Sequence, residues 1–270
     1  MPHQPRKRFG QHFLHDPEVI RRIVAAVAPR PSDRLVEIGP GDGAITLDLL
    51  RAAGRLDAVE LDRDLVGPLE NRCVGLGELH VHGADALRFD FCALAPPGER
   101  LRVVGNLPYN VSTPLLFHLL DQIGCICDMH FMLQKEVVDR MAARPGGKSY
   151  GRLSVMLQAR CAVTRLFDIG PGAFRPPPKV ESSLVRLTPL EHPPQIADVE
   201  VFARVVSAAF MQRRKTLRNS LKGLLTEETI AALGINPSVR PEQLPLADFV
   251  ALAGAACKVD SATRDKGKQR

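Results

Sequence analysis

The feature that most restricts the fold is a short apolar stretch that runs directly into closely spaced glycines. Residues 34–38 have the composition of a buried strand, and Gly39, Gly41 and Gly43 follow before a helical pattern over residues 44–53. Glycines at such a turn let the backbone reverse sharply and let a ligand approach where a side chain would clash. This order indicates a parallel α/β sheet with a ligand site at the carboxyl ends of its strands.

The alternation of strand and helix patterns continues along the first two-thirds of the chain. Strands are predicted over residues 56–61, 79–82, 101–104 and 129–133, late antiparallel strands over 167–169 and 183–187, and helices over 16–27, 137–143 and 154–161. A proline-bearing stretch over 188–198 predicts a linker. We therefore expect a doubly wound α/β domain over residues 1–190, a small all-helical domain over 199–258 and a charged, disordered tail over 259–270.

The composition is that of an ordinary globular protein, with 45% hydrophobic and 24% charged residues in a chain of 270. No apolar run reaches the roughly 18 residues needed to cross a bilayer, and the basic N-terminal stretch lacks the apolar segment of a secretory signal. We expect a cytoplasmic, monomeric protein with reduced cysteines. Neither the pair Cys125 and Cys127 nor the pair His80 and His82 has the partners of a metal site, so no metal is expected.

Basic residues gather at two places in this chain of net charge +6. One group lies at the start and one lies late, without an acid inside it: Arg6, Lys7 and Arg8, and then Arg213, Arg214, Lys215, Arg218 and Lys222. The late group is predicted to lie on a helix, where Arg214, Arg218 and Lys222 share a face because they are spaced by four. A solvated charged face is the plain interpretation, and contact with RNA phosphates is the functional one.

Acidic residues accompany the glycine turn at the predicted edge of the sheet. Glu60 ends the second strand, and Asp85 and Ala86 follow the third, so two acceptors converge on the turn. A dinucleotide fingerprint spaces its glycines G-x-G-x-x-G to seat a pyrophosphate, whereas the third glycine here comes one position early. Glu37 beside the turn suits a cationic sulfonium ligand better than a diphosphate. The pattern favours S-adenosylmethionine over NAD as the cofactor.

A second motif follows the predicted fourth strand, in the order Asn106, Leu107, Pro108 and Tyr109. The exocyclic amine of a base is a poor nucleophile, because its lone pair is delocalised into the ring. The side-chain oxygen of Asn106 and the carbonyl of Leu107 can accept its two N–H bonds. Pro108 can hold that carbonyl in place, and Tyr109 can stack on the base. The motif predicts catalysis by positioning and electrostatics, and a simple turn after a strand is its structural alternative.

Seven stretches resemble the ribosomal RNA adenine dimethylases, in their bacterial small-subunit form: residues 6–14, 37–43, 105–114, 132–136, 150–154, 174–180 and 212–219. They follow the expected order, from Arg6 to about Leu252. The resemblance implies a class I methyltransferase fold. It also implies dimethylation of N6 of two adjacent adenosines near the 3′ end of 16S rRNA, with four methyl donors, during late assembly of the 30S subunit.

The resemblance also implies roles for particular residues. The methyl-donor pocket would be lined by His12, Leu14, Glu37, Gly39, Gly41, Glu60, Asp85, Ala86 and Asn106. Phe174 would close over a flipped adenine opposite Tyr109, and stacking of a base on an aromatic contributes about 1–3 kcal/mol. Position 12 is often Asn in the family, which leaves the role of His12 open. Some members have a bulkier residue at the position of Gly43.

Other functions stay open on the sequence. The 23S rRNA adenine methyltransferases that confer macrolide resistance share the fold and related motifs. A noncatalytic RNA-binding factor for ribosome assembly is the alternative from a different class, and the intact donor and base motifs argue against it. A small-molecule methyltransferase is less favoured, because it would need neither the base motif nor two basic clusters.

Overall fold

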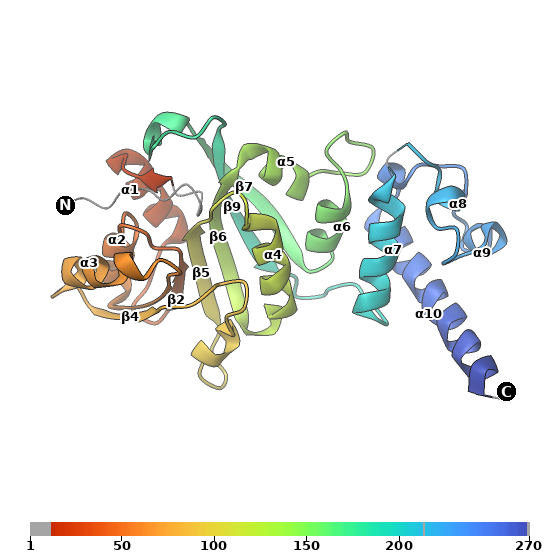
Figure 1. Cartoon of the computed structure of the whole chain (residues 1–270), viewed down its shortest axis with the longest axis horizontal. Helices are drawn as coiled ribbons and strands as arrows, with labels where there is room; N and C mark the ends of the chain where they lie inside the picture. Colours follow the sequence, from red (N-terminus) through yellow and green to blue (C-terminus); the bar gives the residue numbers. More distant parts are fainter. Residues whose placement is uncertain (1–11, 213, 269–270) are drawn as a thin grey trace. The chain divides into compact units, whose positions relative to one another are not determined.

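The computed structural model describes residues 12–212 and 214–268, with side chains up to Val259. The chain forms two compact units (Figure 1). The first comprises Met1–Val138 and Val163–Pro189, and the second comprises Asp139–Ala162 and Leu190–Arg270. The domain expected over residues 1–190 is therefore interrupted, because its residues 139–162 belong to the second unit.

The first unit is built on one large sheet and a short separate pair of strands. The large sheet contains β2 (Arg34–Ile38), β3 (Arg55–Val59), β4 (Glu78–His82), β5 (Leu101–Asn106), β6 (Ile126–Gln134), β7 (Cys161–Ile169) and β9 (Ser182–Pro189). Its strand order is β4-β3-β2-β5-β6-β9-β7. The separate pair joins β1 (Phe13–Leu14) antiparallel to β8 (Phe174–Arg175).

The pairing of the strands confirms the predicted doubly wound α/β fold. β2 is parallel to β3 on one side and to β5 on the other, and β5 is parallel to β6. The late strand β9 runs antiparallel to β6, as predicted. The chain order reverses at β2, and such a switch point is where ligands of open α/β sheets bind.

Helices and short 3-10 turns connect these strands (Figure 1). They are α1 (Pro17–Val27), α2 (Thr46–Ala53), α3 (Arg63–Cys73), η2 (Phe91–Leu94), α4 (Ser112–Asp121), η3 (Ile123–Cys125), α5 (Lys135–Met141) and η4 (Pro171–Ala173). The predicted start of α1 is confirmed, because the Asp16 carboxylate accepts hydrogen bonds from the amides of Glu18 and Val19 at 2.9 and 3.2 Å. Two helices, α3 and α4, were not predicted, and a proline lies within each, Pro68 in α3 and Pro114 in the first turn of α4.

Both faces of the sheet are buried. Leu35, Val104 and Met132 belong to one hydrophobic cluster that also contains residues of α1, α2 and α3. Val36 and Val103 alternate to the opposite face and are equally buried. At Gly105 the strands leave no room for a side chain, since a Cβ there would lie 2.6 Å from the carbonyl oxygen of Ile38. Packing around β2 and β5 thus fixes the place where the fourth-strand motif begins.

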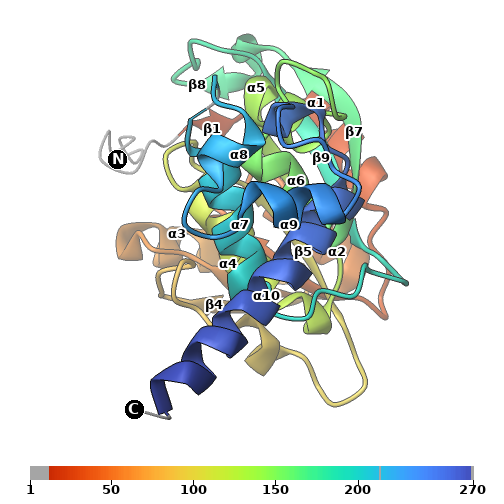
Figure 2. The same cartoon turned by 90° about the vertical axis from the view of Figure 1, so that its right-hand side faces the viewer.

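The second unit is helical (Figure 2). It contains α6 (Arg152–Gln158), α7 (Val199–Met211), α8 (Leu217–Ser220), α9 (Glu227–Ala232), η5 (Pro241–Gln243) and α10 (Leu246–Lys268). Tyr150 and Val155 join its core, together with Phe202 and Phe249, and this shared burial explains why residues 139–162 belong here. The tail expected to be disordered from residue 259 is instead a continuation of α10 to Lys268.

The prediction of one helix through the late basic cluster is wrong. α7 ends at Met211, and only the short α8 follows. The backbone amides of Leu217 and Arg218 bond instead to the carbonyls of Val239 and Pro237, at 2.9 and 3.0 Å. These bonds to the loop over residues 237–239 replace the bonds that a continuous helix would make. Residues spaced by four therefore do not share a helix face in this segment.

The cysteines also differ from the expectation, because Cys92 and Cys125 form a disulfide. Gln122 holds their segments together, accepting from the amide of Phe91 at 2.7 Å and donating to the carbonyl of Phe89 at 3.1 Å. Within the described part of the chain, no group of three or more His, Cys, Asp or Glu is arranged to hold a metal ion. No helix in that part has the length and hydropathy of a membrane span.

Candidate active site

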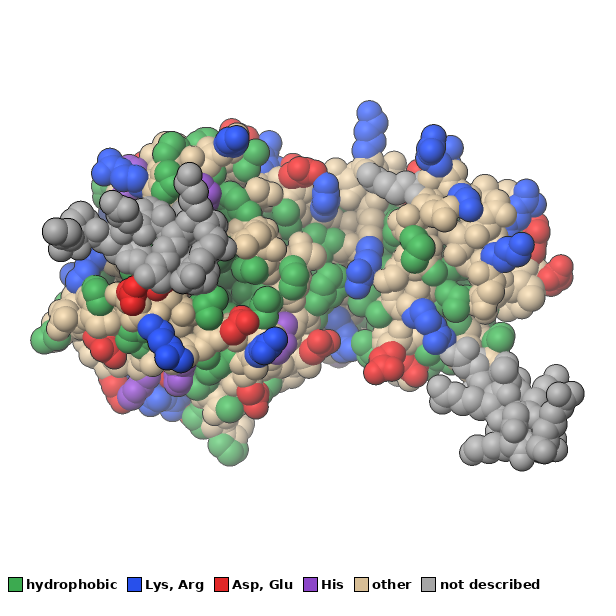
Figure 3. Space-filling view, in the orientation of Figure 1, with side chains coloured by type: hydrophobic (Ala, Val, Ile, Leu, Met, Phe, Trp, Pro, Cys, Tyr) green, Lys and Arg blue, Asp and Glu red, His purple; other side chains and the backbone are tan. Residues whose placement is uncertain are grey.

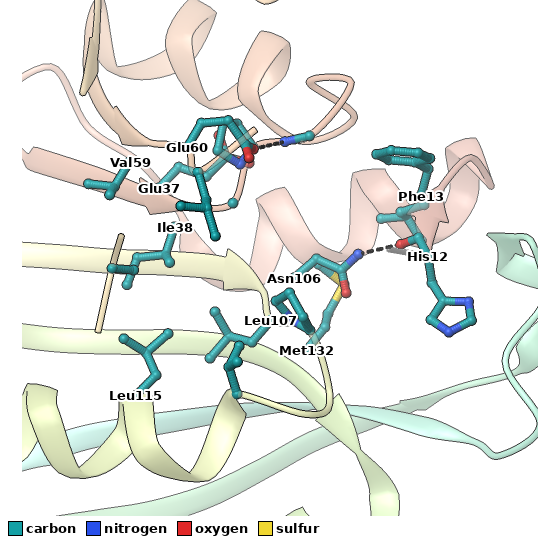
Figure 4. Close-up of a pocket in the computed structure, with 18 of the residues that line it drawn as sticks. His12, Phe13, Glu37, Ile38, Val59, Glu60, Asn106, Leu107, Leu115 and Met132 are labelled. Carbon is teal, nitrogen blue, oxygen red and sulfur yellow. Dashed lines mark hydrogen bonds between the residues drawn. The ribbon is translucent and has the colours of Figure 1, made fainter. Parts of the chain in front are cut away.

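A pocket of about 340 Å³ lies at the carboxyl ends of β2, β3 and β5 (Figure 4). It is lined by every residue that the sequence analysis assigned to the donor site: His12, Leu14, Glu37, Gly39, Gly41, Glu60, Asp85, Ala86 and Asn106. Leu107, Pro108 and Tyr109 line the same pocket. The predicted cofactor turn and the predicted base motif therefore meet in one cavity.

The glycine turn shapes one wall of this pocket. Gly39 has a φ of +66°, and a Cβ built on it would meet no atom within 4 Å, so its backbone borders open space. A Cβ on Gly41 would lie 3.0 Å from the ring of Phe13. Gly43 has a different role, because its Cβ would lie 2.6 Å from a methyl carbon of Leu69 in α3. The first two glycines thus keep the pocket accessible, whereas the third allows helix packing.

Glu60 follows β3 and is held by two backbone amides. Its Oε1 accepts from the amide of Asp62 at 2.8 Å, and its Oε2 accepts from the amide of Gly41 at 3.1 Å. Burial raises the pKa of Glu60, and these two amides oppose that rise. The carboxylate is therefore fixed against the glycine turn, with lone pairs left over for ligand hydroxyls.

Glu37 lies deeper in the pocket and is 1% exposed. Its Oε2 has no hydrogen-bond partner. Burial is the main cause that raises the pKa of Glu37 to about 8, and the nearby charge of Glu60 adds to it. A buried acceptor without a partner is costly, so this wall of the pocket suits a ligand that brings a cationic or N–H donor group.

Asn106 ends β5 with its amide group in a defined orientation (Figure 4). Its Nδ2 donates a 2.8 Å hydrogen bond to the main-chain carbonyl of His12. The amide of Leu107 donates to the carbonyl of Met132 at 3.3 Å, which ties the motif to β6. Because the Asn106 nitrogen is engaged, its Oδ1 is the atom available to accept a bond from a bound amine.

Tyr109 completes the motif from the loop before α4. Its hydroxyl forms a 2.7 Å hydrogen bond with Ser182 Oγ in β9, and its carbonyl accepts from Ser112 Oγ at 3.1 Å. Burial raises the pKa of Tyr109, which keeps the phenol neutral. The ring of His12 stacks on it with a centroid distance of 5.5 Å. An aromatic surface thus borders the cavity beside Asn106.

Phe174 is not where the resemblance implied. It lies in β8 opposite Leu14, is 2% exposed, and belongs to the hydrophobic core of the first unit. It does not line the pocket described here. The apolar interior that β1 and β8 cover accounts for this position, and the ring beside Tyr109 belongs to His12.

Several residues of the site were not predicted from the sequence. Phe13, Leu115 and Met132 line the pocket, and Ser182 anchors Tyr109. Leu61, next to Glu60, also lines it and is 51% exposed. Three of them carried a signal in the sequence. Phe13 and Met132 lie within stretches 6–14 and 132–136 described above, and Leu61 directly follows the acidic end of its strand, at the same sheet edge.

Comparison with known proteins identifies the family. The model of the family described as "Ribosomal RNA adenine dimethylase" matches residues 2–256. The chain belongs to this family. A protein of Methylococcus capsulatus named "Ribosomal RNA small subunit methyltransferase A" is 60% identical over 253 residues, covering 94% of this chain and 98% of that protein. One of the same name from Pseudomonas aeruginosa is 59% identical, covering 93% of this chain and 94% of that protein.

Solved structures agree with this membership in the dimethylase family. A dimethyladenosine transferase from Plasmodium falciparum has a TM-score of 0.75 at 26% identity, covering 89% of this chain and 96% of that one. The 23S rRNA methyltransferase ErmE has a TM-score of 0.69 at 24% identity, covering 90% and 99%, and shows likeness of fold. The chain is thus an S-adenosylmethionine-dependent methyltransferase with a class I fold.

Four of the eight basic residues predicted to contact RNA lie within the part of this dimethylase that the structure describes. Arg6, Lys7, Arg8 and Arg213 lie outside the described residues. Arg214, Lys215, Arg218 and Lys222 are exposed on the second unit. Arg218 pairs with Glu227 at 3.3 Å, so its charge is partly compensated. Lys and Arg recur over the visible face of this unit, interspersed with acids (Figure 3).

Proposed function

We propose that the enzyme transfers methyl groups from S-adenosylmethionine to N6 of two adjacent adenosines near the 3′ end of 16S rRNA, giving N6,N6-dimethyladenosine during late 30S assembly. The observation that carries this proposal is the oriented amide of Asn106 at the edge of the donor pocket. The names of the relatives at 59–60% identity support the small subunit as the source of the substrate.

The pocket fits the methyl donor on three counts. The unpartnered Oε2 of Glu37 would accept from the ammonium group of the methionine part. Glu60 would accept from the ribose hydroxyls, and Asp85 would accept from the adenine amino group. The backbone at Gly39 and Gly41 would border the ligand, because neither residue presents a side chain. When bound, S-adenosylmethionine supplies an electrophilic methyl group.

The base motif would act by positioning. Asn106 Oδ1 and the Leu107 carbonyl would accept the two N–H groups of adenine N6 and favour a pyramidal nitrogen with an available lone pair. Tyr109 would support the base by stacking. No base is needed to remove a proton beforehand, since the proton can leave after transfer, so catalysis would come from orientation and electrostatics.

We assign RNA binding to the basic residues of the second unit. Arg214, Arg218 and Lys222 are exposed and would contact phosphates. Changing all three to Ala should weaken rRNA binding and lower its salt dependence by up to about two counterions. Lys258→Ala, an exposed cation on α10, is the matched control. If the triple variant shows the same salt dependence of rRNA binding as the wild type, these residues form a solvated charged surface and do not contact phosphates.

The deciding experiment is transfer of labelled methyl from S-adenosylmethionine to 30S subunits that lack adenine dimethylation, followed by nucleoside analysis. We expect N6,N6-dimethyladenosine in 16S rRNA. Label on 23S rRNA alone would favour the macrolide-resistance type of activity instead. An enzyme that binds the donor and labels no RNA would contradict the proposed substrate and leave the fold assignment intact.

A further inference from the structure

The ring of His12 is held in place from two sides. It stacks on Tyr109 with a centroid distance of 5.5 Å and an interplanar angle of 28°. Its Nδ1 lies 2.7 Å from the carbonyl oxygen of Pro176. A carbonyl oxygen can only accept, so Nδ1 carries the proton and donates. His12 therefore connects the base motif to the loop that follows β8.

The stack leaves no space for a base between the two rings. Aromatic atoms in contact lie about 3.5–4 Å apart, so a base inserted between His12 and Tyr109 would need roughly 7 Å between their planes. The observed centroid distance is 5.5 Å. One face of the Tyr109 ring is thus covered by a side chain of the protein itself.

We propose that His12 is a gate residue, whose ring occupies the stacking face of Tyr109 in the RNA-free enzyme and is displaced by the target adenine. This inference rests on the proposed function, because it takes Tyr109 as the surface on which the base stacks. It adds a positioning and selectivity role for the side chain of residue 12. A base must compete with the imidazole, so only a base that also bonds to Asn106 gains enough to open the gate.

The geometry allows the ring to move without loss of the catalytic arrangement. The bond that orients Asn106 goes to the main-chain carbonyl of His12, whereas the stack and the bond to Pro176 involve only the side chain. Rotation about the side-chain torsions can therefore uncover Tyr109 while the Asn106 amide stays fixed. The two-residue strands β1 and β8 hold the backbone of this segment in register.

The sequence provides a direct probe of this stack. The chain has no Trp and only two Tyr, so Tyr150→Phe leaves Tyr109 as the sole fluorophore of its kind. In this background, quenching of Tyr109 by acrylamide measures how far the ring is covered. We expect His12→Ala to increase the quenching constant and His12→Phe, which keeps a stacking ring, to leave it low.

Competition is tested with adenosine 5′-monophosphate as the probe base and uridine 5′-monophosphate, whose base has no exocyclic amine to bond to Asn106, as the control that should bind weakly to every variant. The donor site is first saturated with S-adenosylhomocysteine, so that the nucleotide reports only on the second site. Relative to the single-Tyr parent, His12→Ala should bind adenosine 5′-monophosphate about two- to tenfold more tightly, the value of one aromatic pair. His12→Phe should not bind it more tightly.

Weaker binding in His12→Ala would overturn the proposal, because the ring would then be a partner of the base. Equal binding would also overturn it, because the ring would not obstruct the base. Both results leave methyl transfer to 16S rRNA by the wild-type enzyme untouched, so failure of the gate is distinct from failure of the proposed function.

Discussion

The Asn106 side-chain amide donates a 2.8 Å hydrogen bond to the main-chain carbonyl of His12, a residue 94 positions earlier in the chain. This bond determines which atom of the amide is presented to the pocket. Since the nitrogen is occupied, the oxygen is left to accept from an amine. A backbone atom serves as the anchor, so substitutions of the His12 side chain do not remove it.

This relationship predicts the outcome of substitutions at Asn106. Asn106→Ala should reduce methyl transfer by about 10²–10³-fold or more, because it removes the acceptor and its anchor, while donor binding persists at least in part. Asn106→Asp should be similarly impaired, because a carboxylate cannot donate to the His12 carbonyl. Single-turnover transfer and separate titration of donor binding measure the two effects. Unchanged turnover in either variant would contradict the assigned role of Asn106.

Glu37→Gln should stabilise the ligand-free protein and weaken donor binding. The pKa of Glu37 is raised from 4.5 to about 8 in the folded state, so the folded protein retains a proton that the unfolded chain loses. Stability is consequently lost as pH rises from about 4.5 to 8, and Gln removes that loss, which amounts to about 3 kcal/mol at pH 7. Denaturant unfolding from pH 5 to 8 measures it. A variant with wild-type pH dependence would contradict the burial argument.

His130 predicts the opposite pH dependence. It is 1% exposed, neither ring nitrogen has a hydrogen-bond partner, and burial lowers its pKa from 6.5 to about 4. In the unfolded chain His130 is protonated below about pH 6.5, whereas in the folded protein it stays neutral down to about pH 4. The free energy of unfolding should therefore decrease by up to about 3 kcal/mol as the pH falls from 6.5 to 4. His130→Phe should flatten that part of the unfolding profile, and an unaltered slope would assign it to other groups.

Gly105→Ala should be destabilising by about 1–3 kcal/mol, because the new methyl would lie 2.6 Å from a backbone oxygen of β2. The strands would separate next to Asn106, so transfer should fall as well. Gly254→Ala is the matched control, since a Cβ there meets nothing within 4 Å and lies in α10. Thermal unfolding of both variants measures the difference. Equal stability would mean that β2 and β5 can separate at little cost.

The disulfide between Cys92 and Cys125 predicts a stability that depends on reductant. It closes a loop of 33 residues, which in the chain-entropy treatment corresponds to about 4 kcal/mol. A reducing agent should lower the unfolding midpoint of the wild-type protein. It should not change the unfolding midpoint of the Cys125→Ser variant, which has no disulfide to reduce. Identical midpoints with and without reductant in the wild type would show that the bond contributes nothing. Labelling of exposed Cys127 serves as the internal control for thiol reactivity.

Local sequence was sufficient for the elements that carry a complete signal in themselves. β2 spans Arg34–Ile38 as predicted, and α1 begins at its Asp16 cap, because capping and strand patterns act over a few residues. The glycine turn and the strand-end acids also reached the correct edge, since parallel strands bring their carboxyl ends together. The positions of the residues at the strand ends were therefore predictable from spacing alone.

Tertiary structure decided what depends on residues far apart in the chain. Nothing near Asn106 in the sequence indicates that His12 orients its amide. The proline run beside Phe174 allowed a buried hydrophobic contact as the alternative to base stacking, and the pairing of β8 with the distant β1 is consistent with that alternative. The segment after Met211 has helical charge spacing, yet its amides bond to the 237–239 loop. In each case a distant partner offers a better hydrogen bond or more apolar burial than the local pattern, and that competition is resolved only in the folded protein.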